Sequence, residues 1–151
     1  MTTLWSGLEA LPFAEHLRHG RWSYALVSAA HILGIALLLG AVMPLNLRLM
    51  DLAWRGIPLA TVQRLLRPAA ATGLAVAIVS GFLLFSVNAT DYAATRLFRL
   101  KMALVLAGTL HALLNLQSLS GSGRWQRRRA GALSAVIWLS ALICGRFLGF
   151  L

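Results

Sequence analysis

The sequence predicts an all-α membrane protein, an up-down bundle of four transmembrane helices preceded by a short helix on the membrane surface. Hydrophobic residues make up 59% of the 151 residues and charged residues only 12%. The apolar residues fall into four long runs, and about 20 such residues are enough to cross a bilayer as a helix. Unbroken runs favour helices over barrel strands, which alternate. We therefore expect a single integral membrane domain over residues 1–151.

The predicted elements follow one another with little chain between them. Leucines near helical spacing, with Pro12 as a break, predict the surface helix at about residues 4–19. The predicted spans cover about residues 22–45, 66–87, 97–119 and 130–151. Small residues at four-residue spacing predict which faces pack together: Ala30 and Gly34; Gly73, Ala77 and Gly81; Ala141, Gly145 and Gly149.

The net charge of +10 would suit nucleic acid, but the cations flank the apolar runs, so we expect a lipid partner and no nucleic acid. Eight arginines share the side reached after the first and third spans, and fewer cations lie on the other side. The positive-inside rule then predicts outward termini, in the periplasm of a bacterial inner membrane. The eight are Arg48, Arg55, Arg64, Arg67, Arg124, Arg127, Arg128 and Arg129.

Two histidines lie within the predicted spans, where polar side chains are costly and usually face a partner inside the bundle. His31 is nine residues beyond Trp22, and His111 is ten beyond Lys101. At 1.5 Å per residue these depths are about 14 and 15 Å. Since the first and third helices of an up-down bundle run the same way, the two imidazoles are expected at one level.

Two imidazoles at one level on opposing helices are the axial ligand set of a non-covalent b-type haem. Gly34 and Gly108 each lie three residues from a histidine and would leave room for the macrocycle. Ser28 and Asn115 would accept the proton of the ring nitrogen that does not bind iron. Arg99 and Lys101 would pair with the propionates. The leading hypothesis is a haem b protein that passes single electrons, with quinone or a redox protein as partner.

Other interpretations stay open. Both histidines would serve structure alone if His31 bonded to a backbone carbonyl and His111 to Asn115, and a proton or quinone site is a further alternative. Copper handling would use His31 with a methionine such as Met43. A non-catalytic anchor would use the basic segment "GRWQRRRAG". No phosphate loop or hydrolase motif is present, so any enzyme would be at most a membrane oxidoreductase or its cytochrome subunit.

The stretches "HILGIALLLGAVMPLNLRLM" and "FRLKMALVLAGTLHALLNL" carry a family resemblance. They resemble a family of small bacterial four-helix membrane proteins catalogued as domain of unknown function 6644. The matching positions are His31, Gly34, Arg48, Phe98, Arg99, Lys101 and Met102, while Asn46 stands where many members carry Asp. More distantly, the layout is similar to copper-resistance D membrane domains and to small membrane cytochromes b. These relatives imply copper handling and haem electron transfer, respectively.

Overall fold

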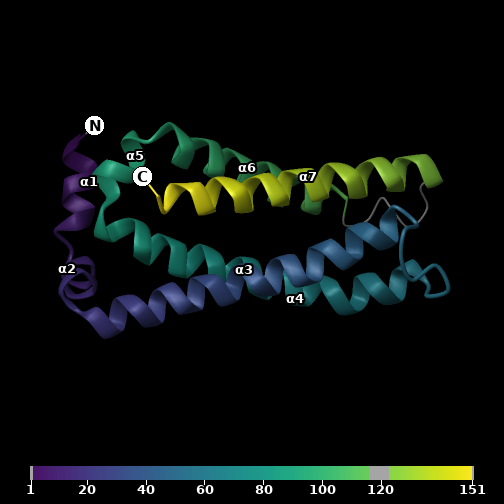
Figure 1. Cartoon of the computed structure of the whole chain (residues 1–151), viewed down its shortest axis with the longest axis horizontal. Coiled ribbons are helices and arrows are strands. Elements are labelled where there is room, and N and C mark those ends of the chain that lie inside the picture. The colour runs from purple at the N-terminus through teal and green to yellow at the C-terminus, as the bar shows by residue number, and fades with distance from the viewer. Residues whose placement is uncertain (1, 116–122, 151) are drawn as a thin grey trace. The chain divides into compact units, whose positions relative to one another are not determined.

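The chain is all-α in a computed structural model that describes residues 2–115 and 123–150. Figure 1 shows the helices in chain order, and no strand occurs in either described range. The helices are α1 (Thr2–Glu9), α2 (Pro12–His19), α3 (Arg21–Leu49), α4 (Leu59–Val87), α5 (Ala89–Ala94), α6 (Arg96–Leu114) and α7 (Arg124–Leu148).

Four of these helices, α3, α4, α6 and α7, are long and apolar enough to cross a membrane. The predicted fold class is therefore confirmed, and the chain is an integral membrane protein of the all-α class. Large apolar side chains stay exposed along these helices; Leu33 and Leu106 are each 68% exposed and Val136 is 62% exposed. In a bilayer such side chains face lipid, so their exposure carries no cost.

The helix ends differ from the predicted spans. α3 runs through Pro44 to Leu49, since membrane helices tolerate an internal proline. α4 begins at Leu59, seven residues earlier than expected. A membrane helix continues beyond the apolar layer where the chain carries polar side chains. The basic segment expected to connect the last two spans is largely helical, because α7 already begins at Arg124.

α6 ends earlier than predicted, at Leu114. At this end of the helix the Asn115 side chain Nδ2 donates to the His111 carbonyl at 2.7 Å, beside the Asn115 backbone amide at 3.2 Å. The rest of the predicted third span, residues 116–119, lies outside the described residues.

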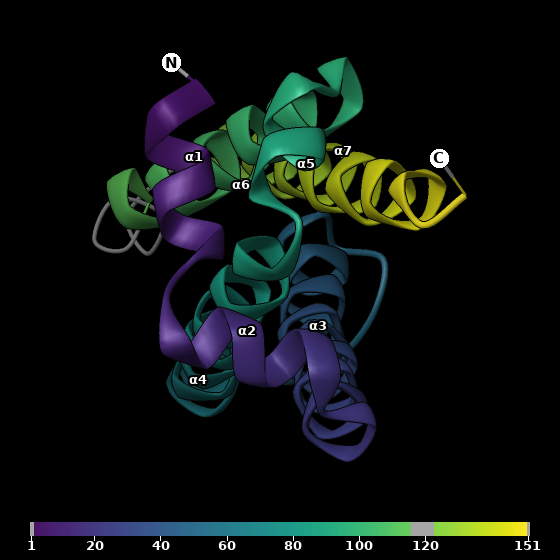
Figure 2. The same ribbon diagram turned by 90° about the vertical axis from the view of Figure 1, so that its left-hand side faces the viewer.

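The predicted surface helix is two helices, α1 and α2, with the expected break next to Pro12. That proline is the first residue of α2, where its missing N–H costs nothing. Figure 2 shows α1 beside α5. Glu9 Oε1 accepts a hydrogen bond from the Thr90 amide at 2.7 Å, and Trp5 meets Phe85 edge to face at 5.5 Å between ring centroids. These contacts fix α1 to α5 and to the C-terminal end of α4.

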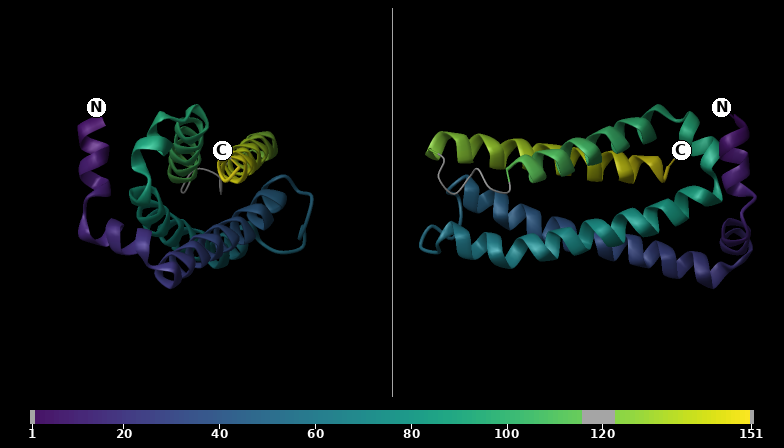
Figure 3. Two further views of the ribbon diagram at one scale, coloured as in Figure 1. Left: turned by 60° about the vertical axis from the view of Figure 1, so that its left-hand side comes forward. Right: turned by 180° about the vertical axis from the view of Figure 1, so that it is seen from behind.

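Contacts divide the chain into two compact units, and α3 and α4 each contribute to both. The first unit holds the chain up to Leu38 together with Ala71–Arg96, and the second holds Leu39–Ala70 together with the chain from Leu97. Figure 3 shows the helices of both units from two further sides. The expectation of one domain over the whole chain stays a prediction.

Candidate functional site

The α3–α4 pair of the first unit is an antiparallel contact between backbones. A Cβ atom on Gly34 would lie 2.7 Å from the Ala77 nitrogen, and one on Gly73 would meet the backbone of Leu38. Only glycine permits so close an approach. Gly34 on α3 and Gly73 and Ala77 on α4 thus lie in the packing faces, as their spacing predicted. The space beside Gly34, which the haem hypothesis gives to a porphyrin, is filled by α4.

His31 lies one turn before Gly34 and contacts the same neighbouring helix. Its Nδ1 donates to the Ala77 carbonyl at 2.9 Å, and Ser80 Oγ lies 3.2 Å from the same nitrogen. A Cβ on Gly81 would lie 2.9 Å from the imidazole Cε1, so this glycine makes room for the ring. Local spacing suggested Ser28, whereas Nδ1 bonds to α4.

This hydrogen bond decides the tautomer of His31. A carbonyl oxygen only accepts, so the proton is on Nδ1 and the lone pair of the neutral ring is on Nε2. Metal-binding histidines commonly have this arrangement, because a carbonyl bonded to one ring nitrogen orients the other toward the metal. His31 therefore has the electronic form that an iron ligand needs.

The α6–α7 pair of the second unit is built differently. A Cβ on Gly108 would lie 2.9 Å from Trp138 Cε2, so the expected opening beside this glycine is filled by an indole ring from α7. Trp138 is only 5% exposed. Glycine here accommodates a side chain instead of a backbone.

His111 has the opposite tautomer. Its Nε2 donates to the Ala130 carbonyl at 3.1 Å, and Asn115 Nδ2 lies 3.4 Å from its Nδ1. With the proton on Nε2, Nδ1 is the acceptor and the Asn115 amide the donor, the reverse of the role expected for Asn115. Both ring nitrogens are engaged by the second unit itself, and Nε2 carries no lone pair for a metal.

The two expected propionate partners do not act together. Arg99 and Lys101 are two residues apart on α6, and residues at that spacing lie on different faces of a helix. Arg99 is exposed, whereas Lys101 is partly buried against α7, with its Cε 3.3 Å from where a Cβ on Gly145 would lie. Only Arg99 is placed as an exposed cation.

The predicted ligands belong to different units, His31 to the first and His111 to the second, so their shared level stays a prediction. For copper, the described residues hold no group of three or more His, Cys, Asp or Glu able to bind a metal ion. Met43 lies twelve residues from His31 on the same helix, about 18 Å along its axis, too far to share an ion.

One buried polar residue was missed by the sequence analysis as a candidate. Asn46 is 2% exposed, and among the described residues its Nδ2 is the one buried side-chain nitrogen or oxygen without a hydrogen-bond partner. Leaving such a donor unsatisfied costs about 1–3 kcal/mol. The signal was present, since Asn46 is a lone amide inside the apolar run "VMPLNL".

Comparisons with protein-family models, with curated proteins and with solved structures each find no match to this chain. The resemblance to the four-helix family described above stays a prediction, and the functional argument depends on the geometry of the two histidines.

Proposed function

We propose that this chain binds haem b in a bacterial inner membrane and passes single electrons, and that His31 and His111 would hold the haem iron. The observation that carries the proposal is the hydrogen bond from His31 Nδ1 to the Ala77 carbonyl, which leaves the lone pair on Nε2. Haem, when bound, supplies the one-electron chemistry. The chain's own part is to hold the iron, exclude water with apolar helices and pair the propionates.

The two histidines fit the iron unequally. His31 needs no change of tautomer. His111 has to give up its Nε2–H bond to the Ala130 carbonyl, and the proton moved to Nδ1 then opposes the Asn115 Nδ2 donor, so two neutral hydrogen bonds of about 1 kcal/mol each are lost. Arg99 is an exposed cation that α6 offers to a propionate. Gly34 and Gly108 serve helix packing in this proposal, because the space beside each glycine is already occupied by the neighbouring helix.

The proposed orientation follows the positive-inside rule, with both termini in the periplasm. Electrons would pass between a quinol in the bilayer and an acceptor protein on the outer side. The cations of that side, such as Arg18 and Arg21, would meet an acidic partner surface.

An optical spectrum tests this function. The protein is expressed with ample haem, purified in detergent and scanned for a Soret band. We expect a band that His31→Ala abolishes and that His111→Ala shifts toward a five-coordinate spectrum. His19→Ala is the matched control, since His19 ends α2 outside the spans, and it should leave the band unchanged. A folded, haem-supplied preparation without a Soret band would refute the proposal.

A non-catalytic membrane anchor is the second candidate. The observation that favours it is the full engagement of His111, whose two ring nitrogens bond within the second unit as a purely structural histidine would. An anchor predicts a colourless protein that co-purifies with a soluble redox protein and keeps that partner after His31→Ala.

A further inference from the structure

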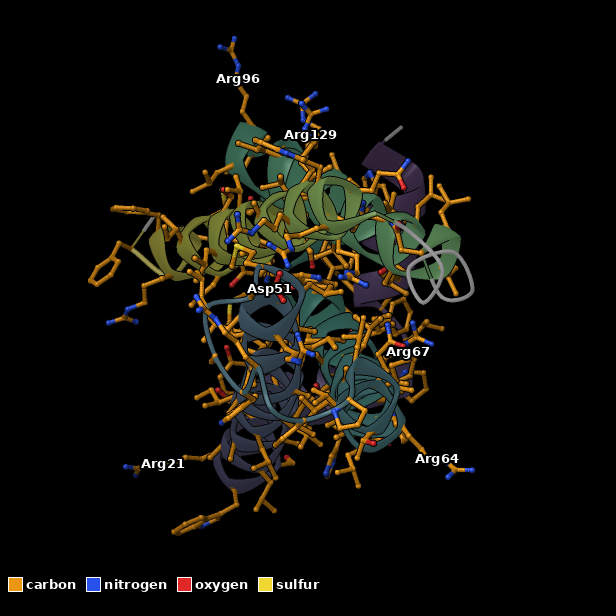
Figure 4. The ribbon with its side chains drawn as sticks, turned by 90° about the vertical axis from the view of Figure 1, so that its right-hand side faces the viewer. Arg21, Asp51, Arg64, Arg67, Arg96 and Arg129 are labelled. Atoms are coloured by element: carbon orange, nitrogen blue, oxygen red, sulfur yellow. The ribbon has the colours of Figure 1, made fainter. Side chains whose placement is uncertain are left out.

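The first turns of α4 border an open cavity that the proposed function does not use. Its volume is about 290 Å³, and its lining residues are Ala60, Gln63, Arg64, Arg67 and Pro68. Gln63 is only 5% exposed, Arg67 is half-buried, and Arg64 is exposed. Residues three apart on a helix share a face. Figure 4 shows the labelled Arg64 and Arg67 side chains on the same side of the molecule.

The cavity is cationic without a counter-charge from the chain. None of its lining residues is acidic, and both ion pairs formed within the described ranges use Asp51, not Arg64 or Arg67. Arg67 Nη2 donates to the Asn115 carbonyl at 3.5 Å, a long bond, and the other guanidinium donors make no hydrogen bond with residues 2–115 or 123–150. A partly buried guanidinium is stabilised when an anion accepts from it.

The length of α4 places this cavity near the membrane surface. The helix has 29 residues, about 43 Å at 1.5 Å per residue, which exceeds the hydrocarbon thickness of about 30 Å. Its apolar run begins near Leu66. Gln63 and Arg64 therefore lie beyond the hydrocarbon layer, and Arg67 lies at its edge, at the depth of lipid headgroups.

Pro68 adds a local reason for the cavity. It lies inside α4 and has no N–H, so the Arg64 carbonyl lacks its usual helical donor four residues on. Ala60 and Pro68 supply small apolar walls, while the Gln63 amide and the two guanidiniums supply donors.

We propose that this cavity binds an anionic phosphate group, with the two arginines and Gln63 as its ligands. Planar guanidiniums match phosphate oxygens through paired hydrogen bonds, which ammonium groups do not. This group belongs either to the headgroup of an anionic lipid or to free phosphate in the adjoining water. The depth of the cavity and its apolar walls fit the lipid headgroup, and the chemistry of recognition is shared.

The test measures lipid retained by the purified full chain, by native mass spectrometry, with phosphatidylglycerol and phosphatidylcholine of identical acyl chains. The parent should retain phosphatidylglycerol in preference. Arg64→Gln with Arg67→Gln should weaken this retention about 25-fold, at roughly fivefold per arginine. The control removes two arginines of α7 that do not line the cavity, Arg127→Gln with Arg129→Gln, and should bind within about twofold of the parent.

A third variant, Gln63→Leu, keeps the charge and removes the amide. The proposed site predicts that it weakens the retention of phosphatidylglycerol, whereas attraction by charge alone predicts no change. Circular dichroism melts confirm that each variant is folded. Competition by inorganic phosphate would identify the ligand source as free phosphate, and persistence of the lipid would identify the headgroup. An equal loss of phosphatidylglycerol binding in the two double-arginine variants would overturn the proposed site. Equal retention of the two lipids by the parent protein would overturn it as well.

Discussion

The α3–α4 pair and the α6–α7 pair each join a histidine to a backbone carbonyl of the neighbouring helix, but through different ring nitrogens. His31 donates from Nδ1 to Ala77, whereas His111 donates from Nε2 to Ala130. In the sequence the two motifs look like mirror images, with glycine three residues after His31 and three before His111. The difference teaches that a matched pattern does not fix a matched tautomer.

The glycines differ in the same way. Gly34 and Gly73 bring two backbones together, so an added atom meets groups that cannot move without shifting a helix. Gly108 faces the Trp138 ring, which is a side chain and has some freedom to turn. One pair is held by backbone contact, and the other by a buried aromatic ring.

The largest effect is expected from Gly34→Ala. The new Cβ would lie 2.7 Å from the Ala77 nitrogen, so α3 and α4 have to separate, and we expect a loss of about 1–3 kcal/mol of unfolding free energy. Thermal unfolding in detergent measures it. Gly40→Ala on the same helix is the matched control, because nothing lies within 4 Å of its Cβ position, and it should be neutral or stabilising. Equal melting temperatures for the two variants would contradict backbone contact.

A smaller effect is expected from Gly108→Ala. The added methyl would lie 2.9 Å from Trp138 Cε2, and the indole can give way, so we expect a loss of about 1 kcal/mol. A change in the near-ultraviolet circular dichroism of tryptophan should accompany this loss of stability, since the Trp138 ring itself moves. A destabilisation larger than that of Gly34→Ala would reverse the proposed contrast between the two pairs.

The first unit also contains a titratable contact outside the spans, which gives the smallest expected effect. The Thr90 amide, assisted by Arg18, holds the pKa of Glu9 below its ordinary value. Because the pKa of Glu9 is lowered, the contact contributes stability at any pH above the ordinary pKa that Glu9 has in the unfolded chain. That stability is lost as the pH falls through the pKa of Glu9 in the folded protein. Amide exchange at Thr90 should lose protection over that acidic range.

Glu9→Gln provides the control for this titration, because its amide oxygen still accepts a hydrogen bond but does not ionise. Protection at Thr90 in this variant should be independent of pH in the same range. A parent protein whose Thr90 protection is also constant would show that Glu9 does not bind there.

Much of the fold could be predicted because the apolar runs report directly which segments enter lipid. The early start of α4 could not, since Thr61, Gln63 and Arg64 interrupt the apolar residues there and only the structure shows that residues 59–65 belong to the helix. Small residues in both segments indicated that Gly34 and Gly73 lie in packing faces. Which two faces pack against each other depends on the tertiary structure and cannot be read from either segment alone. The partner of His31 is a carbonyl 46 residues away, beyond any local spacing.

The tautomers of the two histidines test the account most directly, since the haem proposal depends on the lone pair of His31 Nε2. Nitrogen-15 NMR of histidine-labelled protein without haem, assigned with His31→Gln and His111→Gln, distinguishes protonated from unprotonated ring nitrogens. We expect the proton on Nδ1 of His31 and on Nε2 of His111, and upon haem addition the loss of the Nε2 proton of His111. A proton on Nε2 of His31 would contradict the account.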